Sequence, residues 1–212
     1  SVIGGGGLNI IADSRFSVIA GGRKNSVEAD RNISAITGGE GNVIKTAGTH
    51  SFIGGGRYND VASGYSVVAG GKGNTSSGGF STVSGGLNNV ASGGLAAIGG
   101  GYENVALGGR SFVGSGADNY AQGFHTAIVG GRFNTATGNF SFIGAGKYNS
   151  VASGRTYSAI CGGCGLYAQA NKFGQHCQAS GRFAADGDAQ TSQYVLRRQT
   201  TDGTANVELF LN

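Results

Sequence analysis

The sequence predicts an all-β protein, a parallel β-solenoid of stacked coils about 15 residues long. Three observations predict this fold. A Ser-x-Ile/Val-x-Gly-Gly segment recurs at a nearly constant period, 44 of the 212 residues are glycine, and proline is absent. Glycine does not occupy every third position, which excludes a collagen triple helix. No segment shows the 3.6-residue apolar period of a helix.

The repeat begins eleven times. Successive starts are separated by 16, 17 and 17 residues, then by 15 residues six times, and finally by 17. The starts are Ser1, Ser17, Ser34, Ser51, Ser66, Ser81, Ala96, Ser111, Thr126, Ser141 and Ser158. Residues 1–173 are therefore assigned to the repeat solenoid, which stacks like residues about 4.8 Å apart and forms a rod about 50 Å tall.

Three positions of the repeat keep their residue type. The sixth is always glycine, and the ninth is asparagine in ten of the eleven repeats. We expect the Gly-Gly pair to turn the backbone through positive φ, and the asparagine to adopt a left-handed conformation. The third residue is always a β-branched aliphatic that we expect to fill the lumen: Ile3, Ile19, Ile36, Ile53, Val68, Val83, Ile98, Val113, Ile128, Ile143 and Ile160.

A second apolar pattern is expected to face outward, because alternate residues of a strand point to opposite sides. Ordering one coil costs roughly 15–30 kcal/mol of backbone entropy, whereas one buried Ile or Val returns only about 1.5–3 kcal/mol. We therefore predict a parallel homotrimer that covers this pattern, with Phe52, Phe112 and Phe142 buried between chains. The residues that precede the repeat starts belong to the same pattern: Phe16, Tyr65, Phe80, Leu95, Phe140, Tyr157 and Phe173.

The pattern Asn-x-Val-Ala-Ser-Gly-x-x-Ser-x-Ile/Val-x-Gly-Gly occurs at residues 59–71, with a one-residue variation, and again at 89–101. It resembles the YadA-like head repeats of trimeric autotransporter adhesins, which also occur in viral tail fibres, although the usual coil of that family is slightly shorter. The resemblance implies a left-handed parallel β-roll that is trimeric along its length. It also implies an adhesive or receptor-binding function without chemistry.

Residues 174–212 are expected to form a degenerate last coil followed by a C-terminal β-hairpin or transition segment. Alternating residues around Asp202 and Gly203 predict the hairpin. This ending is similar to segments that follow such repeats in phage tail-fibre proteins. It favours a virion location, with host-surface glycan or receptor and other fibre or tail proteins as partners. A bacterial surface adhesin is the alternative.

Other classes of function find little support in the sequence. The net charge is +4, but the basic residues are scattered singly, so nucleic-acid binding is not expected. No apolar run is long enough to span a membrane, and no phosphate-loop motif indicates a cofactor. Only Asp186 and Asp188 form a close acidic pair. We therefore expect no enzymatic activity, and a polysaccharide-cleaving tailspike is the third alternative.

The cysteines and histidines leave alternatives open. Cys161 and Cys177 are placed at the fourth position of successive coils, with His176 at the inward third position, which predicts stacked packing residues or a disulfide. Together with Cys164 they also have the spacing of metal ligands. His50 and His125 precede repeat starts, and they either pack in the trimer interface or gather around an anion or metal.

Exposed turns just past the Gly-Gly pair carry basic residues beside aromatic ones. This combination suits sugar rings and anionic groups, although a solvated edge that keeps the fibre soluble has the same composition. The residues assigned to glycan binding are Arg57, Tyr58, Arg132, Phe133, Lys147 and Tyr148.

Overall fold

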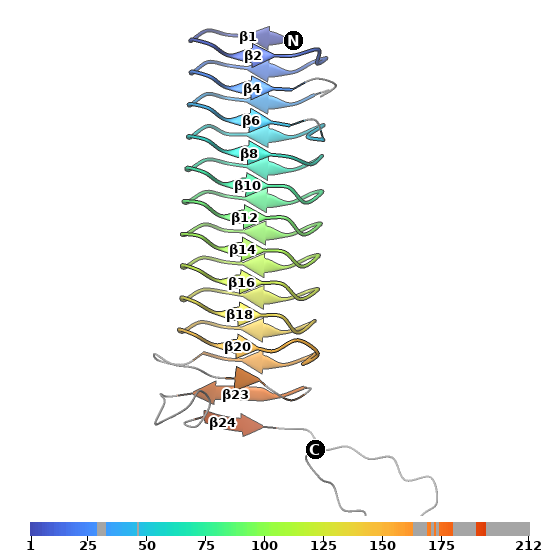
Figure 1. Cartoon of the computed structure of the whole chain (residues 1–212), viewed down its shortest axis with the longest axis vertical. Coiled ribbons are helices and arrows are strands. Elements are labelled where there is room, and N and C mark those ends of the chain that lie inside the picture. The colour runs from blue at the N-terminus through green and yellow to red at the C-terminus, as the bar shows by residue number, and fades with distance from the viewer. Residues whose placement is uncertain are drawn as a thin grey trace, which may run out of the picture.

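The computed structural model shows one long stack of coils, each wound through two short strands (Figure 1). The structure describes residues 1–28, 33–45, 47–162, 169–170, 172, 174–179 and 190–193. Every regular element among these residues is a strand, and none of them forms a helix that could cross a membrane. The fold is a parallel β-solenoid of about eleven turns, as the repeat predicts.

The odd-numbered strands form one sheet, and β24 joins it at its end as the thirteenth strand. The strands are β1 Val2–Ile3, β3 Val18–Ile19, β5 Ala35–Ile36, β7 Phe52–Ile53, β9 Val67–Val68, β11 Thr82–Val83, β13 Ala97–Ile98, β15 Phe112–Val113, β17 Ala127–Ile128, β19 Phe142–Ile143, β21 Ala159–Ile160, β23 His176–Ala179 and β24 Gln190–Gln193.

The other strands form a second sheet of 11 strands, which the sequence analysis did not predict. They are β2 Ile10–Ile11, β4 Ser26–Val27, β6 Val43–Ile44, β8 Asp60–Val61, β10 Thr75–Ser76, β12 Val90–Ala91, β14 Val105–Ala106, β16 Tyr120–Ala121, β18 Thr135–Ala136, β20 Ser150–Val151 and β22 Gln169–Ala170.

The core is a single column between the two sheets. The third residues of the repeats fill one side of it, and from Ile19 to Ile160 each is at most 1 % exposed, as predicted. Ile3 is the exception at 44 % exposed, because β1 is the first strand of its sheet. The second sheet fills the other side with smaller residues such as Val61 and Ala106.

The asparagines stack along one corner, but the expectation of a left-handed backbone was wrong. From Asn25 to Asn149 each side chain is buried, and it supplies hydrogen bonds to the backbone of the turn. Asn89 Nδ2 donates to the carbonyl oxygens of Gly85 and Gly101, both at 3.0 Å, and the amide N–H of Asn104 donates to Asn89 Oδ1 at 3.0 Å. The positive φ falls on the preceding residue, as at Asn88 (56°). Buried backbone groups need such partners, so the asparagine is kept for its amide.

The sixth residue of each repeat must be glycine for two reasons. At Gly56 φ is 84°, a conformation that side chains disfavour. A Cβ atom there would also lie 2.2 Å from the carbonyl oxygen of Gly71 in the next coil. The close stacking of coils therefore excludes any larger residue at this position.

The end of the rod differs from the sequence expectation. β23 pairs with β21 in parallel, with Ile160 opposite Cys177 and Ala159 opposite His176. Cys177 thus takes the inward third position and His176 the outward second one, so the predicted register was wrong by one residue. β24 then pairs with β23 in antiparallel fashion. The hairpin predicted around Asp202 and Gly203 lies outside the described residues.

Candidate binding edges

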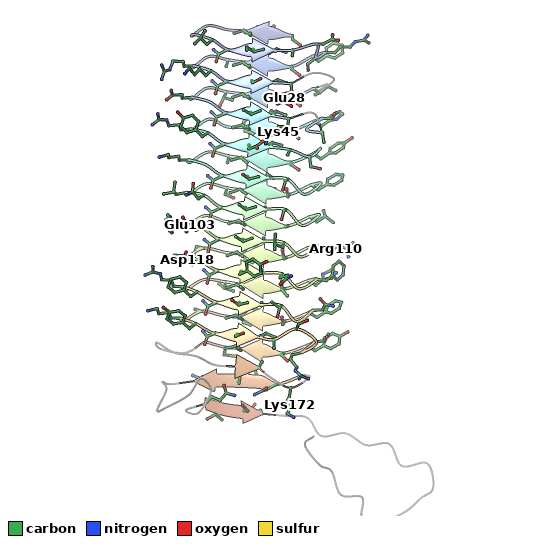
Figure 2. The ribbon with its side chains drawn as sticks, viewed as in Figure 1. Glu28, Lys45, Glu103, Arg110, Asp118 and Lys172 are labelled. Carbon is green, nitrogen blue, oxygen red and sulfur yellow. The ribbon has the colours of Figure 1, made fainter. Side chains whose placement is uncertain are left out.

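Two lateral edges run along the rod where the chain turns between the sheets. We define the Gly-Gly edge as the seventh and eighth residues of the repeats, and the aromatic edge as the residues that precede the repeat starts together with Phe124. Figure 2 shows them on opposite sides, with Glu103 and Asp118 on the Gly-Gly edge and Arg110 on the aromatic edge. Both edges hold large side chains in left-handed backbone, such as Tyr148 and Tyr157, each with a φ of 60°.

Four of the six residues assigned to glycan binding form one cluster on the Gly-Gly edge. The rings of Phe133 and Tyr148 stack with their centroids 4.9 Å apart and 12° between their planes. The Arg132 guanidinium lies 4.6 Å from the Phe133 centroid, and Lys147 Nζ lies 4.7 Å from the Tyr148 centroid. Arg132 Nε also lies 3.5 Å from Asp118 Oδ2. The cluster presents stacked rings flanked by two cations.

Arg57 and Tyr58 form a separate pair. Four positions, from Lys72 to Ala117, intervene between Arg57 and Arg132 along the edge, a separation of about 24 Å at the spacing of β-strands. The Arg57 guanidinium lies 4.9 Å from the Tyr58 ring centroid, and its Nε lies 3.1 Å from Glu40 Oε2. The structure therefore divides the six predicted residues into two groups.

Glu40 joins two arginines across three coils. It pairs with Arg57 on one side and with Arg23 on the other. A hydrogen bond from Arg23, followed by the positive charges of Arg23 and Arg57, lowers the pKa of the Glu40 carboxyl despite partial desolvation. Glu40 thus partly neutralises the Arg57 group, as Asp118 does Arg132. Lys147 forms no ion pair among the described residues, which makes the Arg132 cluster the better candidate for an anionic ligand.

The aromatic edge contains two stacks of three rings. In the first, Tyr65 lies 4.8 Å from both His50 and Phe80 between ring centroids. In the second, Phe140 lies 5.1 Å from both His125 and Tyr157. Each histidine is therefore the end of a ring stack within one chain. The described residues contain no group of three or more His, Cys, Asp or Glu side chains that could hold a metal.

Phe124 adds a second wall to the lower stack, and the sequence analysis missed it. Its ring stands at 90° to His125, with centroids 4.2 Å apart, and at 83° to Phe140, with centroids 6.0 Å apart. The residue two before a repeat start is glycine in four consecutive repeats, from Gly64 to Gly109. A bulky ring in a series of small residues was the available signal.

The flat face of the first sheet carries the phenylalanines that were predicted to lie between chains. Phe52, Phe112 and Phe142 are 37 %, 42 % and 40 % exposed in the single chain. Their strand neighbours are small: Phe112 pairs with Ala97 and Ala127, and Ala127 also pairs with Phe142. Rings thus alternate with gaps along this face.

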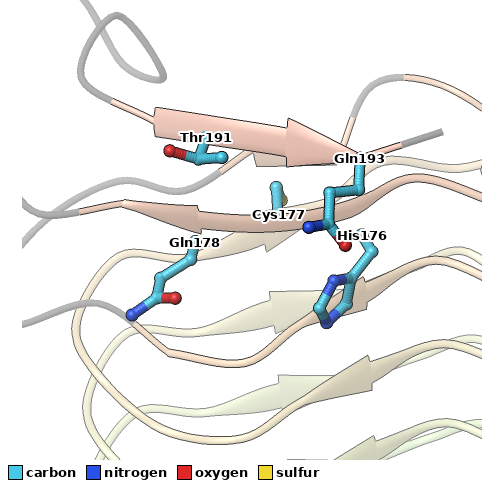
Figure 3. Close-up of a pocket in the computed structure, with 5 residues that line it drawn as sticks. All are labelled: His176, Cys177, Gln178, Thr191 and Gln193. Carbon is cyan, nitrogen blue, oxygen red and sulfur yellow. The ribbon is translucent and has the colours of Figure 1, made fainter.

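Two further groups lie near the C-terminal end. Cys161 Sγ lies 2.9 Å from His176 Nε2, while Cys177 is buried in the core, and both thiols are free. The stacked-disulfide interpretation was therefore wrong and the packing one holds for Cys177; Cys164 lies outside the described residues. A hollow of about 60 Å³ between β23 and β24 is lined by His176, Cys177, Gln178, Thr191 and Gln193 (Figure 3). It is far smaller than the roughly 300–1,000 Å³ of typical ligand pockets.

No protein-family model matches the chain, and no curated protein matches it.

Proposed function

We propose that this chain is a structural and receptor-binding segment of a trimeric viral tail fibre that supports attachment to a host surface. The observation that supports it most is the uninterrupted stack of about eleven coils with exposed phenylalanines along one sheet face. A single core column and parallel pairing from β1 to β23 suit a rod that serves as a rigid spacer in a fibre. The left-handed coil implied by the resemblance belongs to the same proposal.

Trimerisation follows from the exposed sheet face. Monomeric proteins rarely expose contiguous apolar patches larger than a few hundred Å². Phe112 and Phe142 alternate with alanines along this face. The rings of one chain are therefore expected to pack over the alanines of the next. Each phenylalanine buried in this way contributes about 1.5–3 kcal/mol. Other fibre or tail proteins are then expected at the ends of the rod.

A bacterial surface adhesin with the same fold is the second candidate, favoured by the repeat pattern itself. The two differ in genetic context, because a fibre gene is expected among capsid and tail genes and an adhesin gene beside sequence for a membrane anchor. Determining the sequence on both sides of the coding region distinguishes them.

The host contact is assigned to the Gly-Gly edge. Arg57, Tyr58, Arg132, Phe133, Lys147 and Tyr148 present rings and cations to solvent on several coils, and repetition lets weak contacts act together. No catalytic step is proposed. Incubation with host capsule or lipopolysaccharide followed by a reducing-end assay tests the third candidate, a tailspike, which requires the release of new ends.

The first prediction tests this edge with variants that preserve the backbone. Asparagine tolerates left-handed φ, so Phe133→Asn and Tyr148→Asn are combined with Arg132→Ser and Lys147→Ser. A second variant carries Arg57→Ser and Tyr58→Asn. We expect both to keep the melting temperature within about 2 °C, because these side chains lie outside the core. Binding to an array of bacterial capsules and lipopolysaccharides is expected to fall, most for the fourfold variant.

Leu87→Ser is the matched control, because Leu87 occupies the same edge without a cation–ring pair. It is expected to bind the array like the unmodified protein. Unchanged array binding by the two variants combined would show that this edge is only a solvated surface.

A further inference from the structure

The lower part of the aromatic edge combines exposed rings that meet at right angles. Phe124, Phe140 and Tyr157 are 43 %, 44 % and 60 % exposed. Phe140 and Tyr157 stack face to face, with 19° between their planes, and Phe124 stands nearly perpendicular to His125 and Phe140 at the other end of the stack. The rings therefore form two walls of one corner, whereas the upper stack of His50, Tyr65 and Phe80 has one wall.

The backbone holds these rings at an energetic cost. His125, Phe140 and Tyr157 have φ values of 55°, 51° and 60°, a left-handed backbone that non-glycine residues disfavour. Stacking of the aromatic rings offsets only part of that cost. Glycine at these turns would avoid both the strain and the exposed apolar surface. The same left-handed φ recurs at Tyr65, Phe80 and Leu95, so the second wall and the nearby cation are what distinguish this corner.

A glycine makes the room for the second wall. A Cβ atom on Gly109 would lie 3.0 Å from two ring atoms of Phe124 and close to little else. The Phe124 ring therefore contacts the backbone of the preceding coil at Gly109. The backbone N–H of Phe124 donates to Asn139 Oδ1 of the following coil at 2.9 Å. The orientation of Phe124 is determined by these contacts on both sides.

Arg110 supplies a cation beside the rings. Its guanidinium carbon lies 5.7 Å from the Phe124 centroid, and Nη1 lies 3.1 Å from His125 Nε2, which accepts in the tautomer that carries its proton on Nδ1. Among the described residues no carboxylate forms an ion pair with Arg110. The remaining guanidinium N–H groups can therefore donate to a ligand.

The charges of this end of the rod are segregated. Asp118 is the only acidic residue between positions 105 and 162, and it lies on the Gly-Gly edge. Arg110 and Arg155, by contrast, lie in the turns of the aromatic edge, and both are exposed. Charge complementarity thus favours an anionic ligand at the ring corner.

We propose that Arg110, Phe124, His125, Phe140 and Tyr157 form a second binding site, which takes a carboxylated sugar of an acidic surface polysaccharide. The faces of Phe140 are covered by His125 and Tyr157, so the apolar face of a sugar ring packs on the exposed part of Phe124 and against the outer edges of the stacked rings. The carboxylate accepts hydrogen bonds from Arg110. Guanidinium groups suit carboxylates because their parallel N–H groups match the two oxygens. This inference rests on the proposed attachment function and names a ligand class for it.

The test measures binding of defined oligosaccharides by titration calorimetry. The probes are hexamers of galacturonate, of hyaluronan and of sialic acid, and the control is the fully methyl-esterified galacturonate hexamer, which keeps the rings and loses the charge. At least one acidic hexamer is expected to bind, and for galacturonate the ester is expected to bind about tenfold more weakly. Added NaCl is expected to remove most of that difference.

Substitutions then assign the binding to the corner. Arg110→Gln is expected to weaken binding of the acidic hexamer about tenfold. Phe124→Ala should weaken binding severalfold. Gly109→Ala should do the same without deleting any ring, because the new methyl group displaces Phe124. Phe80→Ala is the matched control from the upper stack, which has neither a second wall nor an arginine, and it is expected to bind normally.

Three results would overturn the proposal: no binding of any acidic hexamer, equal binding with and without Arg110, or loss of the trimer on Phe140→Ala or Tyr157→Ala. The last would place these rings between chains. Polysaccharide-array binding that persists while all acidic hexamers fail would refute this site and leave the proposed attachment function standing. Failure of both assays would refute both.

Discussion

At the scale of single residues, the repeat contains two glycines with different roles. Gly71 has a φ of 87°, and a Cβ atom there would lie 2.2 Å from the carbonyl oxygen of Gly86. Gly70, immediately before it, has open space around the same position. Across the repeats the fifth position also holds Ser115 and Ala145, whereas the sixth is always glycine, and the stacking of coils gives the physical reason for this difference.

The second prediction uses this difference. Gly71→Ala is expected to lower the free energy of unfolding by about 2–5 kcal/mol, because it combines left-handed strain with a backbone clash. Gly70→Ala is expected to change it by no more than about 1 kcal/mol. Urea denaturation followed by circular dichroism measures both. Equal destabilisation by the two substitutions would contradict the stacking geometry.

The asparagine series shows what residue type alone does not reveal. Asn and Gly are both common in turns, and the periodic Asn was therefore expected to adopt left-handed backbone. In the structure Asn104 Nδ2 instead donates to the carbonyl oxygens of Gly100 and Gly116, at 3.0 Å and 2.9 Å. These two acceptors belong to neighbouring coils, so the side chain is required by the tertiary contact.

At the scale of elements, the register of β23 decides the chemistry of the last coil. Cys177 is 1 % exposed and points into the core, whereas Cys161 is exposed beside His176. Burial, with a smaller contribution from Cys161, raises the pKa of the Cys177 thiol to about 11. At pH 8 only about one Cys177 in a thousand is then a thiolate, the reactive form.

The third prediction follows from this register. Iodoacetamide at pH 8 is expected to alkylate Cys161 in the native protein and Cys177 only after denaturation, as identified by peptide mass mapping. The position of each label distinguishes these residues from Cys164. Equal native labelling of Cys161 and Cys177, or a disulfide between them under non-reducing conditions, would show that the register is incorrect.

At the scale of the whole molecule, the rod has two surfaces that can bury apolar side chains. One is the sheet face with Phe112 and Phe142, and the other is the aromatic edge with Phe80 and Tyr157. The sequence pattern placed both in one trimer interface, but the structure separates the sheet face from the lateral edge. The proposed trimer therefore uses the sheet face alone and leaves the edge accessible. This division decides where ligands can bind, because a side chain buried between chains is closed to a polysaccharide.

The fourth prediction assigns the interface. Phe112→Arg combined with Phe142→Arg is expected to convert the trimer to monomers at micromolar concentration, as measured by analytical ultracentrifugation. The β-sheet circular dichroism is expected to persist, because neither ring lies in the core. Phe80→Arg on the aromatic edge is the control and is expected to remain trimeric. A monomeric unmodified protein would refute the trimer, and dissociation by Phe80→Arg alone would move the interface to the edge.

The sequence by itself determined the coil. Its period and its inward aliphatic residues, from Ile19 to Ile160, were predicted correctly because a repeat places one physical requirement at one position many times. The side of the core that the second sheet fills was not predicted, since Ala91, Ala106 and Ala121 carry too weak an apolar signal to mark a strand.

Only the tertiary structure decided which side chains meet. It divided the six predicted glycan-binding residues into two groups about 24 Å apart, and it built the corner of Arg110, Phe124 and Phe140 from three successive coils. Residues that are 15 positions apart in the chain become neighbours through the stacking of coils, so contacts between them depend on the exact residue count of each turn. That count was irregular after Ser141, and there the sequence-based register of Cys177 was wrong.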